Sequence, residues 1–144
     1  MNWGMNAAEL REAIEATEQS IEHHRRDVLQ ELEAGRAVRT RVIRGDACAL
    51  CNAYHGRADR QIRGGVETDC AACPLYLKGY GCGEDGGAWM SLCSRILMLS
   101  GCPDNQLARR LQYAAEASKA MIAQLEEVRD SLQAALAALG GDPT

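Results

Sequence analysis

The chain has 144 residues, a formal net charge of −4 and a pI of about 5.4, so its overall charge gives no field that attracts nucleic acid. It contains two tryptophans, four tyrosines and no phenylalanine, which favours helices packed through aliphatic residues and alanine over a sheet. No apolar run approaches the roughly 20 residues of a membrane span, and the N-terminus lacks the pattern of a secretory signal. We therefore expect a cytoplasmic protein that does not enter a membrane.

The first predicted element is an amphipathic helix over residues 7–34. Asn6 and Glu9 have the spacing of a capping box, and Gly35 offers a C-terminal stop. One narrow apolar stripe is expected along it, at alternating steps of four and three residues. The positions of this stripe are Leu10, Ile14, Thr17, Ile21, His24 and Val28. The β-branched stretch 38–43 that follows is either a short strand or an extended connection.

The middle of the chain carries two Cys-x-x-Cys pairs, eighteen residues apart, and a fifth cysteine. Each pair can direct two thiolates at one tetrahedral ion, so the spacing predicts a structural Zn²⁺ site. Four of five cysteines are its expected ligands: Cys48, Cys51, Cys70, Cys73 and Cys82. The two pairs form the simplest set, and Cys82 is the rival ligand. A thiolate knuckle commonly needs a positive φ after its second cysteine, which Asn52 and Gly83 can adopt and Pro74 cannot.

Other chemistry has weaker support in the sequence. An iron–sulfur cluster and disulfide or redox chemistry are the alternatives for the cysteines, and His55 is a further possible ligand. Cys93 is expected to be a small buried hydrophobe, while spacing assigns no role to Cys102. We expect no function for the adjacent His23 and His24. The chain has no phosphate-binding glycine motif, no His-Glu-x-x-His motif and no nucleophile paired with a base, so we expect no enzyme.

A basic segment overlaps the predicted metal module. Seven arginines between residues 36 and 63 are opposed by two aspartates, which gives this segment a charge of +5. The arginines are Arg36, Arg39, Arg41, Arg44, Arg57, Arg60 and Arg63. They make a nucleic-acid-binding regulator the alternative function, because such loops often contact phosphates. Tyr54 is the only aromatic residue within the segment, which leaves little for base stacking.

Two more helices are predicted after the cysteines. A short apolar helix begins at residue 88 and ends at residue 99. Asp104 is the expected N-cap of a long last helix that ends at residue 139. A heptad seam follows that helix: Leu107, Leu111, Ala114, Ser118, Met121, Leu125, Val128, Leu132, Ala135 and Leu139. A second row lies beside it: Ala115, Ile122 and Leu136.

The predicted fold class is mainly α. Two long antiparallel helices form a hairpin or coiled coil, with the cysteine-rich zinc module between them at the end where the chain turns round. The parts of this single domain are the N-terminal helix 1–35, the zinc module 36–87, the short helix 88–103 and the heptad helix 104–144. The apolar face of the last helix is wider than one partner helix covers, so we also expect a homodimer through helices 7–34 and 104–139.

The cysteine pattern resembles a group of small phage-encoded proteins. Its motifs are Cys48-Ala-Leu-Cys51, Cys70-Ala-Ala-Cys73-Pro-Leu-Tyr76 and Gly81-Cys82, followed by Ala114-Ala-Glu116 in a helix. The resemblance covers mainly residues 46–82 and implies a mobile-element origin without a defined biochemical activity. We therefore expect a non-catalytic, zinc-stabilised binding protein. Its expected partner is a host protein or complex, such as a defence system, which it would inhibit or regulate.

Overall fold

The protein is described by a computed structural model that is mainly helical, which confirms the fold class expected from the composition. Its described residues are 3–43, 48–54, 62–63, 66–67, 73–82 and 86–140, with 62–63 and 66–67 described by their backbone alone. Within these residues, no helix is both long enough and apolar enough to cross a membrane.

The N-terminal helical segment is continuous and contains a π-helical turn. It consists of α1 (Ala7–His23), the π-helix η1 (His24–Leu29) and α2 (Gln30–Glu33). Its start has the predicted capping box: Glu9 N–H donates to the Asn6 side chain at 2.8 Å, and Asn6 N–H donates to the Glu9 carboxylate at 3.0 Å. The predicted uninterrupted α-helix therefore forms with one local change of winding.

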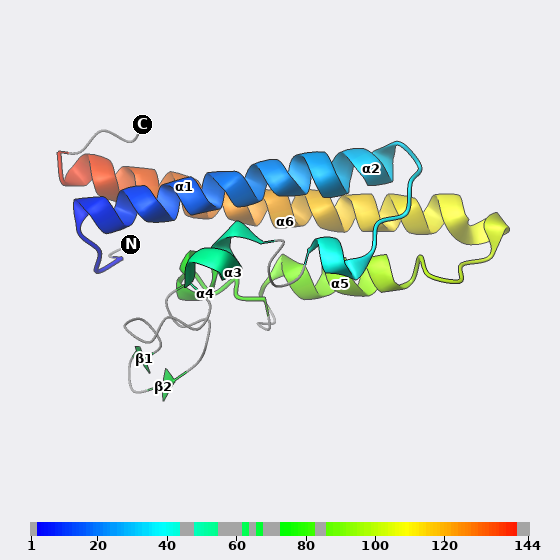
Figure 1. Cartoon of the computed structure of the whole chain (residues 1–144), viewed down its shortest axis with the longest axis horizontal. Helices are drawn as coiled ribbons and strands as arrows, with labels where there is room; N and C mark the ends of the chain where they lie inside the picture. The colour runs from blue at the N-terminus through cyan, green and yellow to red at the C-terminus, as the bar shows by residue number, and fades with distance from the viewer. Residues whose placement is uncertain are drawn as a thin grey trace.

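The long helix α6 (Asp104–Ala138) runs antiparallel beside α1, η1 and α2, so that the start of α1 and the end of α6 lie at the same end of the helix pair (Figure 1). Its 35 residues span about 52 Å at the rise of an α-helix. Asp104 is not the N-cap: Pro103 occupies that position, and Asp104 lies in the first turn, where its charge favours the positive end of the helix dipole. Near the other end, Trp3 Nε1–H donates to Ser131 Oγ at 3.2 Å.

Burial along the helix pair follows the predicted seam only in part. Both predicted rows of α6 contribute to the core, through Leu111, Ala114, Ala115, Ser118, Met121, Ile122, Leu125, Val128, Leu132 and Leu136. Leu139 is 59% exposed, while Leu136 is fully buried. A straight helix has 3.6 residues per turn, so positions that repeat every 3.5 residues gradually move off the buried face. At the end of α6 the buried position is therefore Leu136 and not Leu139.

The prediction of a narrow apolar stripe on the first helix is wrong. Three small residues outside it, Ala13, Ala16 and Ser20, are also buried. The wider face is needed because α1 contacts the helix α3 as well as α6. Alanine and serine are short enough to admit a second helix at close range, which the apolar spacing alone does not reveal.

The remaining elements lie beside the helix pair. They are the 3₁₀ helix η2 (Thr40–Val42), α3 (Ala49–Tyr54), the antiparallel pair β1 (Ile62–Arg63) and β2 (Val66–Glu67), α4 (Pro74–Leu77) and α5 (Ala88–Leu97). The alternative prediction of a short strand at residues 38–43 is therefore wrong. An extended stretch followed by a 3₁₀ turn leads from α2 toward the part of the chain that carries α3 and α4, called the central segment below.

The central segment is not at the end where the chain turns round, as the sequence analysis expected. It packs against the side of the helix pair, below the middle of α1 and α6 in Figure 1. The reason is α5, which lies along α6 and separates the central segment from the turn into α6. The seam is buried within one chain, so burial of that face does not require the expected homodimer, which stays a prediction.

Candidate metal centre

Four cysteines from three separate parts of the chain line one small cavity of about 20 Å³. The lining residues are Cys48, Leu50, Cys51, Cys73, Leu75, Tyr76, Gly81 and Cys82. A volume of this size holds one small ion or one water molecule. Two aliphatic side chains, Leu50 and Leu75, are 1% exposed and close the cavity toward the core. The cavity therefore combines several sulfur donors with an apolar wall.

Short helices position three of the thiols. Cys48 directly precedes α3, and Cys51 lies in its first turn, so the two sulfurs are three residues apart on one helical face. Cys73 is the N-cap residue of α4, with Pro74 at the first helical position. Asn52 does not provide the expected knuckle turn, because it is helical and no described non-glycine residue has a positive φ.

The ionisation of these thiols is coupled. A hydrogen bond from the Cys51 thiol lowers the pKa of Cys48 to about 6 against the opposing effect of burial, with smaller contributions from backbone N–H groups and Ser20. The same hydrogen bond raises the pKa of Cys51, as do burial and the charges of Cys48, Cys82 and Cys73. Burial raises the pKa of Cys73 to about 12. Several thiolates in one apolar cavity therefore need a compensating positive charge.

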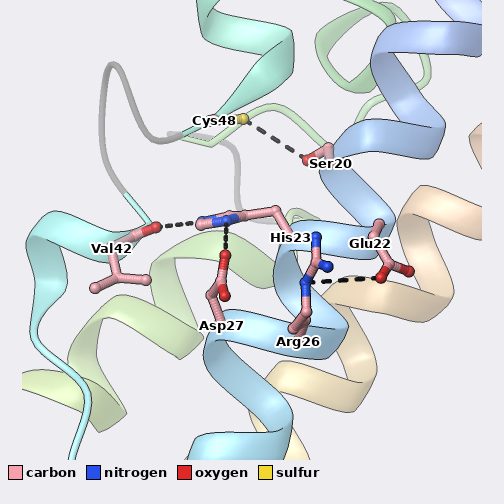
Figure 2. A network of polar contacts seen from close by, with 7 residues as sticks. All are labelled: Ser20, Glu22, His23, Arg26, Asp27, Val42 and Cys48. Atoms are coloured by element: carbon pink, nitrogen blue, oxygen red, sulfur yellow. Dashed lines mark hydrogen bonds and ion pairs between the residues drawn. The ribbon is translucent and has the colours of Figure 1, made fainter.

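Helix α1 contacts Cys48 and the end of η2 at two points, one turn apart (Figure 2). The hydroxyl of Ser20 lies 3.8 Å from Cys48 Sγ. One turn later, His23 lies 2.6 Å from the Val42 carbonyl through Nε2 and 2.8 Å from the Asp27 carboxylate through Nδ1. His23 thus links η1 and η2 through the two nitrogens of one ring.

Helix α6 holds the segment around Cys82 on both of its sides. On one side, the Tyr80 hydroxyl donates to the Glu127 carboxylate at 2.6 Å. On the other, the Gln124 amide accepts from Ala88 N–H and donates to the Gly86 carbonyl, both at 2.7 Å. Cys82 is thus carried by a segment fixed to the opposite helix from the one that contacts Cys48.

A close backbone approach tightens this second attachment. A Cβ atom at Gly87 would lie 2.3 Å from the Gly81 carbonyl oxygen, so a larger residue at position 87 would displace the chain beside Cys82. Glycine at this position therefore has a packing role that the sequence alone does not indicate.

The four thiols suit Zn²⁺ by chemistry, since a structural zinc site uses four tetrahedral sulfur or nitrogen ligands. Within the described ranges, however, no three or more histidine, cysteine or carboxylate side chains stand at metal-ligand geometry. The described cysteines form no disulfide with one another. The arrangement is thus a convergence of donors on one cavity rather than a formed coordination shell.

The other cysteines and histidines differ from this group. Cys70 and His55 lie outside the described residues. Cys93 packs partly buried against the core from α5, so it is less enclosed than expected, and Cys102 donates a weak thiol hydrogen bond to the Pro103 carbonyl at 3.4 Å. Neither of these two lines the thiol cavity.

The predicted basic segment is only partly described. Arg44, Arg57 and Arg60 lie outside the described residues, as does the side chain of Arg63. Arg36 forms an ion pair with Glu31, while Arg39 and Arg41 are exposed and pair with no other described residue. Tyr54 is 1% exposed and belongs to the core, so it offers no ring for stacking with a base.

Sequence reasoning missed the residues that attach the module to the helices. Ser20, Gln124 and Glu127 were assigned no role, and no function was expected for His23. Ser20 lies beside the predicted stripe, and a small polar residue on a helical face that packs against a second element was the one available signal.

Comparisons with protein-family models, curated proteins and solved structures find no match.

Proposed function

We propose that this protein is a non-catalytic, zinc-stabilised helical binding protein. The observation that carries the proposal is the convergence of Cys48, Cys51, Cys73 and Cys82 on one cavity. These four cysteines would hold the ion, which makes Cys82 the ligand in place of Cys70. Bound Zn²⁺ would supply positive charge to the buried thiolates and stabilise the short helices α3 and α4 that carry them. Four protein ligands leave no open position for a substrate, which favours a structural ion.

A role in binding is supported by the way this centre is attached. Ser20 on α1 contacts Cys48, and Glu127 and Gln124 on α6 fix the chain on either side of Cys82. An ion at the cavity would therefore brace the central segment against both long helices and make one rigid surface. The resemblance to small phage-encoded proteins supports a host protein or complex as the partner, met in the host cytoplasm, with inhibition or regulation as the outcome.

Nucleic-acid binding is the second candidate, and the exposed Arg39 and Arg41 favour it, since their side chains pair with no other described residue. The burial of Tyr54 weighs against it, because it removes the single aromatic residue of the basic segment from any contact with bases. We rank protein binding first for this reason.

Purified protein is expected to contain one zinc ion per chain and to be colourless. Elemental analysis by mass spectrometry gives the metal content, and an absorption spectrum serves as the control, since an iron–sulfur cluster absorbs visible light. Protein without stoichiometric metal, or with iron and visible absorption, would contradict the proposal. A titration of free thiols before and after denaturation would separate metal-bound sulfurs from disulfides.

Replacing Ser20 with alanine is expected to weaken zinc binding about 10- to 100-fold, the usual effect of removing a partner that orients a metal ligand. The hydroxyl contacts Cys48 Sγ and lies on a helix, so alanine keeps the backbone while removing the contact. Competition with a zinc chelator measures the affinity. Thr17→Ala is the matched control, since Thr17 is equally buried on α1 but its hydroxyl donates to the Ala13 carbonyl. Equal affinities for the two variants would show that Ser20 does not orient the ligand.

A further inference from the structure

The turn end of the helix pair carries a groove between the chain after α2 and the C-terminal part of α5. The hollow has a volume of about 640 Å³. Its walls include Val38, Arg39 and Thr40 on one side and Ile96, Leu97 and Leu99 on the other. Figure 1 shows the chain from α2 to η2 passing beside α5 at this end of the molecule. The groove is thus distinct from the thiol cavity, which lies near the middle of the helix pair.

Large apolar side chains are exposed around this groove. Leu97 is 59% exposed, Met98 is 44% exposed, and Met90 lies two helical turns before Leu97 with 50% exposure. Residues seven apart share one face of a helix, so Met90 and Leu97 belong to the same outward side of α5. Three of the five large apolar side chains found exposed in the described residues therefore lie on or next to this one short helix.

The charge around the groove is opposite in sign to that of the whole chain. Arg36 aside, since it pairs with Glu31, the described residues 37–43 and 86–112 contain five arginines and a single acidic residue, Asp104, a net charge of +4 in a chain of −4. The side chains of Arg39, Arg41 and Arg109 form no hydrogen bond or ion pair with another described residue. Nearby Glu31 and Glu33 are already paired, with Arg36 and Lys119. The rim of the groove therefore presents uncompensated positive charge beside an apolar floor.

We infer that this groove binds an acidic segment of a partner protein that carries apolar side chains at helical spacing. Apolar anchors would enter between Val38 and Leu97, and carboxylates would meet Arg39, which lines the groove, and the exposed Arg41 two residues further along the chain. The inference rests on the proposed binding function and specifies where the partner docks and what its chemistry is.

The positive charge of the groove would also suit nucleic acid, but the apolar floor of the groove would not. The phosphates of a nucleic acid would pair with the arginines, but they would gain nothing from contact with exposed leucine and methionine side chains. Its bases would need aromatic rings on which to stack. Two aromatic residues near α5 already have other partners: the Arg95 guanidinium lies over the Tyr113 ring, 5.2 Å from ring centre to Cζ, and Trp89 Nε1–H donates to the Ile43 carbonyl at 2.8 Å. The apolar floor therefore favours a protein segment.

The test uses purified, full-length protein and labelled peptides in a fluorescence-anisotropy titration. The main probe is a 16-residue peptide with leucines at positions 3, 6, 7, 10, 13 and 14 and glutamates elsewhere. The comparison probes are the same peptide with lysine for glutamate, a scrambled Leu/Glu peptide, and a 20-base-pair DNA duplex. We expect the ordered Leu/Glu peptide to bind at least about tenfold more tightly than each of the other three.

Two pairs of variants locate the binding. Leu97→Asp is expected to weaken peptide binding about tenfold or more, while Leu139→Asp, at the opposite end and equally 59% exposed, leaves it unchanged. Arg39→Glu is expected to weaken binding, while Arg11→Glu on the exposed face of α1 does not. Zinc content and helicity of every variant are measured alongside.

Each outcome of these experiments either supports or contradicts the inference. Tight binding of the DNA duplex with none of the Leu/Glu peptide would overturn the inference in favour of nucleic acid. Equal effects of Leu97→Asp and Leu139→Asp, or equal binding of the Leu/Lys peptide, would also overturn it. A dimer by light scattering that Leu97→Asp converts to a monomer would assign the groove to a second copy of the chain instead. Protein that carries its zinc but fails these peptide tests would overturn the groove alone, whereas absence of metal would contradict the proposed function.

Discussion

Replacing Cys82 with serine is expected to weaken zinc binding about a hundredfold or more, while Cys93→Ser leaves it unchanged. Structural zinc sites supply about 10–16 kcal/mol from four ligands, so losing one thiolate removes several kcal/mol of binding free energy. Serine keeps the size of the side chain but is a poor zinc ligand at neutral pH. Cys93 is the matched control, since it is partly buried like Cys82 but lies on α5 and does not line the cavity.

The structural consequence of Cys82→Ser is expected to be local. The helices α3 and α4, with six and four residues, border the cavity and depend on the ion, whereas α1 and α6 are joined by a continuous buried seam. Far-UV circular dichroism should therefore show a small loss of helix, in keeping with these ten residues. A collapse of most of the helicity would mean that the central segment and the helix pair unfold as one cooperative unit.

The choice between the two ligand sets is tested by a second variant. Cys70→Ser is expected to bind zinc as tightly as the unmodified protein, measured with the same chelator competition. If Cys70→Ser weakened binding and Cys82→Ser did not, the two Cys-x-x-Cys pairs would form the site as spacing alone suggests. The cavity would then be a packing feature without a metal role.

The sequence was most informative where local chemistry decides the structure. The Asn6–Glu9 capping box and the glycine at position 35, with φ of +82°, delimit the first helix because both act within a few residues. The rows of α6 were recognisable because helical periodicity is a property of one element. The drift from Leu139 to Leu136 was not, since the heptad pattern gives no measure of how far two helices coil around each other.

The spacing of the cysteines in the sequence could not predict where the central segment lies. Metal-ligand spacing identifies which cysteines can meet, but not which surface carries them, because that depends on contacts between residues distant in sequence. Tyr80 reaches Glu127 and Ser20 reaches Cys48, across 47 and 28 residues respectively. Polar contacts of this kind have no periodicity, so the module was expected at the end of the hairpin instead of against its side.

Lowering the pH from 7 to 5 is expected to destabilise the unmodified protein by about 2 kcal/mol more than its His24→Leu variant. His24 is 1% exposed at the start of the π-helical turn, and its Nδ1 atom has no hydrogen-bond partner among the described residues. Burial lowers its pKa from 6.5 to about 4, and the neighbouring His23 contributes further by charge repulsion. In the unfolded chain the same imidazole is free to bind a proton near its ordinary pKa.

The sign of the effect follows from the difference in proton binding. Between pH 6.5 and 4 the unfolded state binds more protons than the folded state, so the stability contributed by neutral His24 is complete above pH 6.5 and is lost as the pH falls through this window. The full loss approaches about 3 kcal/mol below pH 4. Urea unfolding of both proteins at pH 7 and pH 5 gives the four free energies required.

Comparing two proteins at two pH values isolates the histidine from the metal. Acid also protonates thiolates and releases zinc, but that loss is common to both proteins and cancels in the difference. Leucine is close in volume to histidine and keeps the contact of η1 with α6, so the variant tests charge more than packing. Equal acid destabilisation of the two proteins would show that His24 does not remain neutral in the folded state. A larger loss in the unmodified protein would show that the helix pair itself becomes less stable in acid, whatever the state of the metal centre.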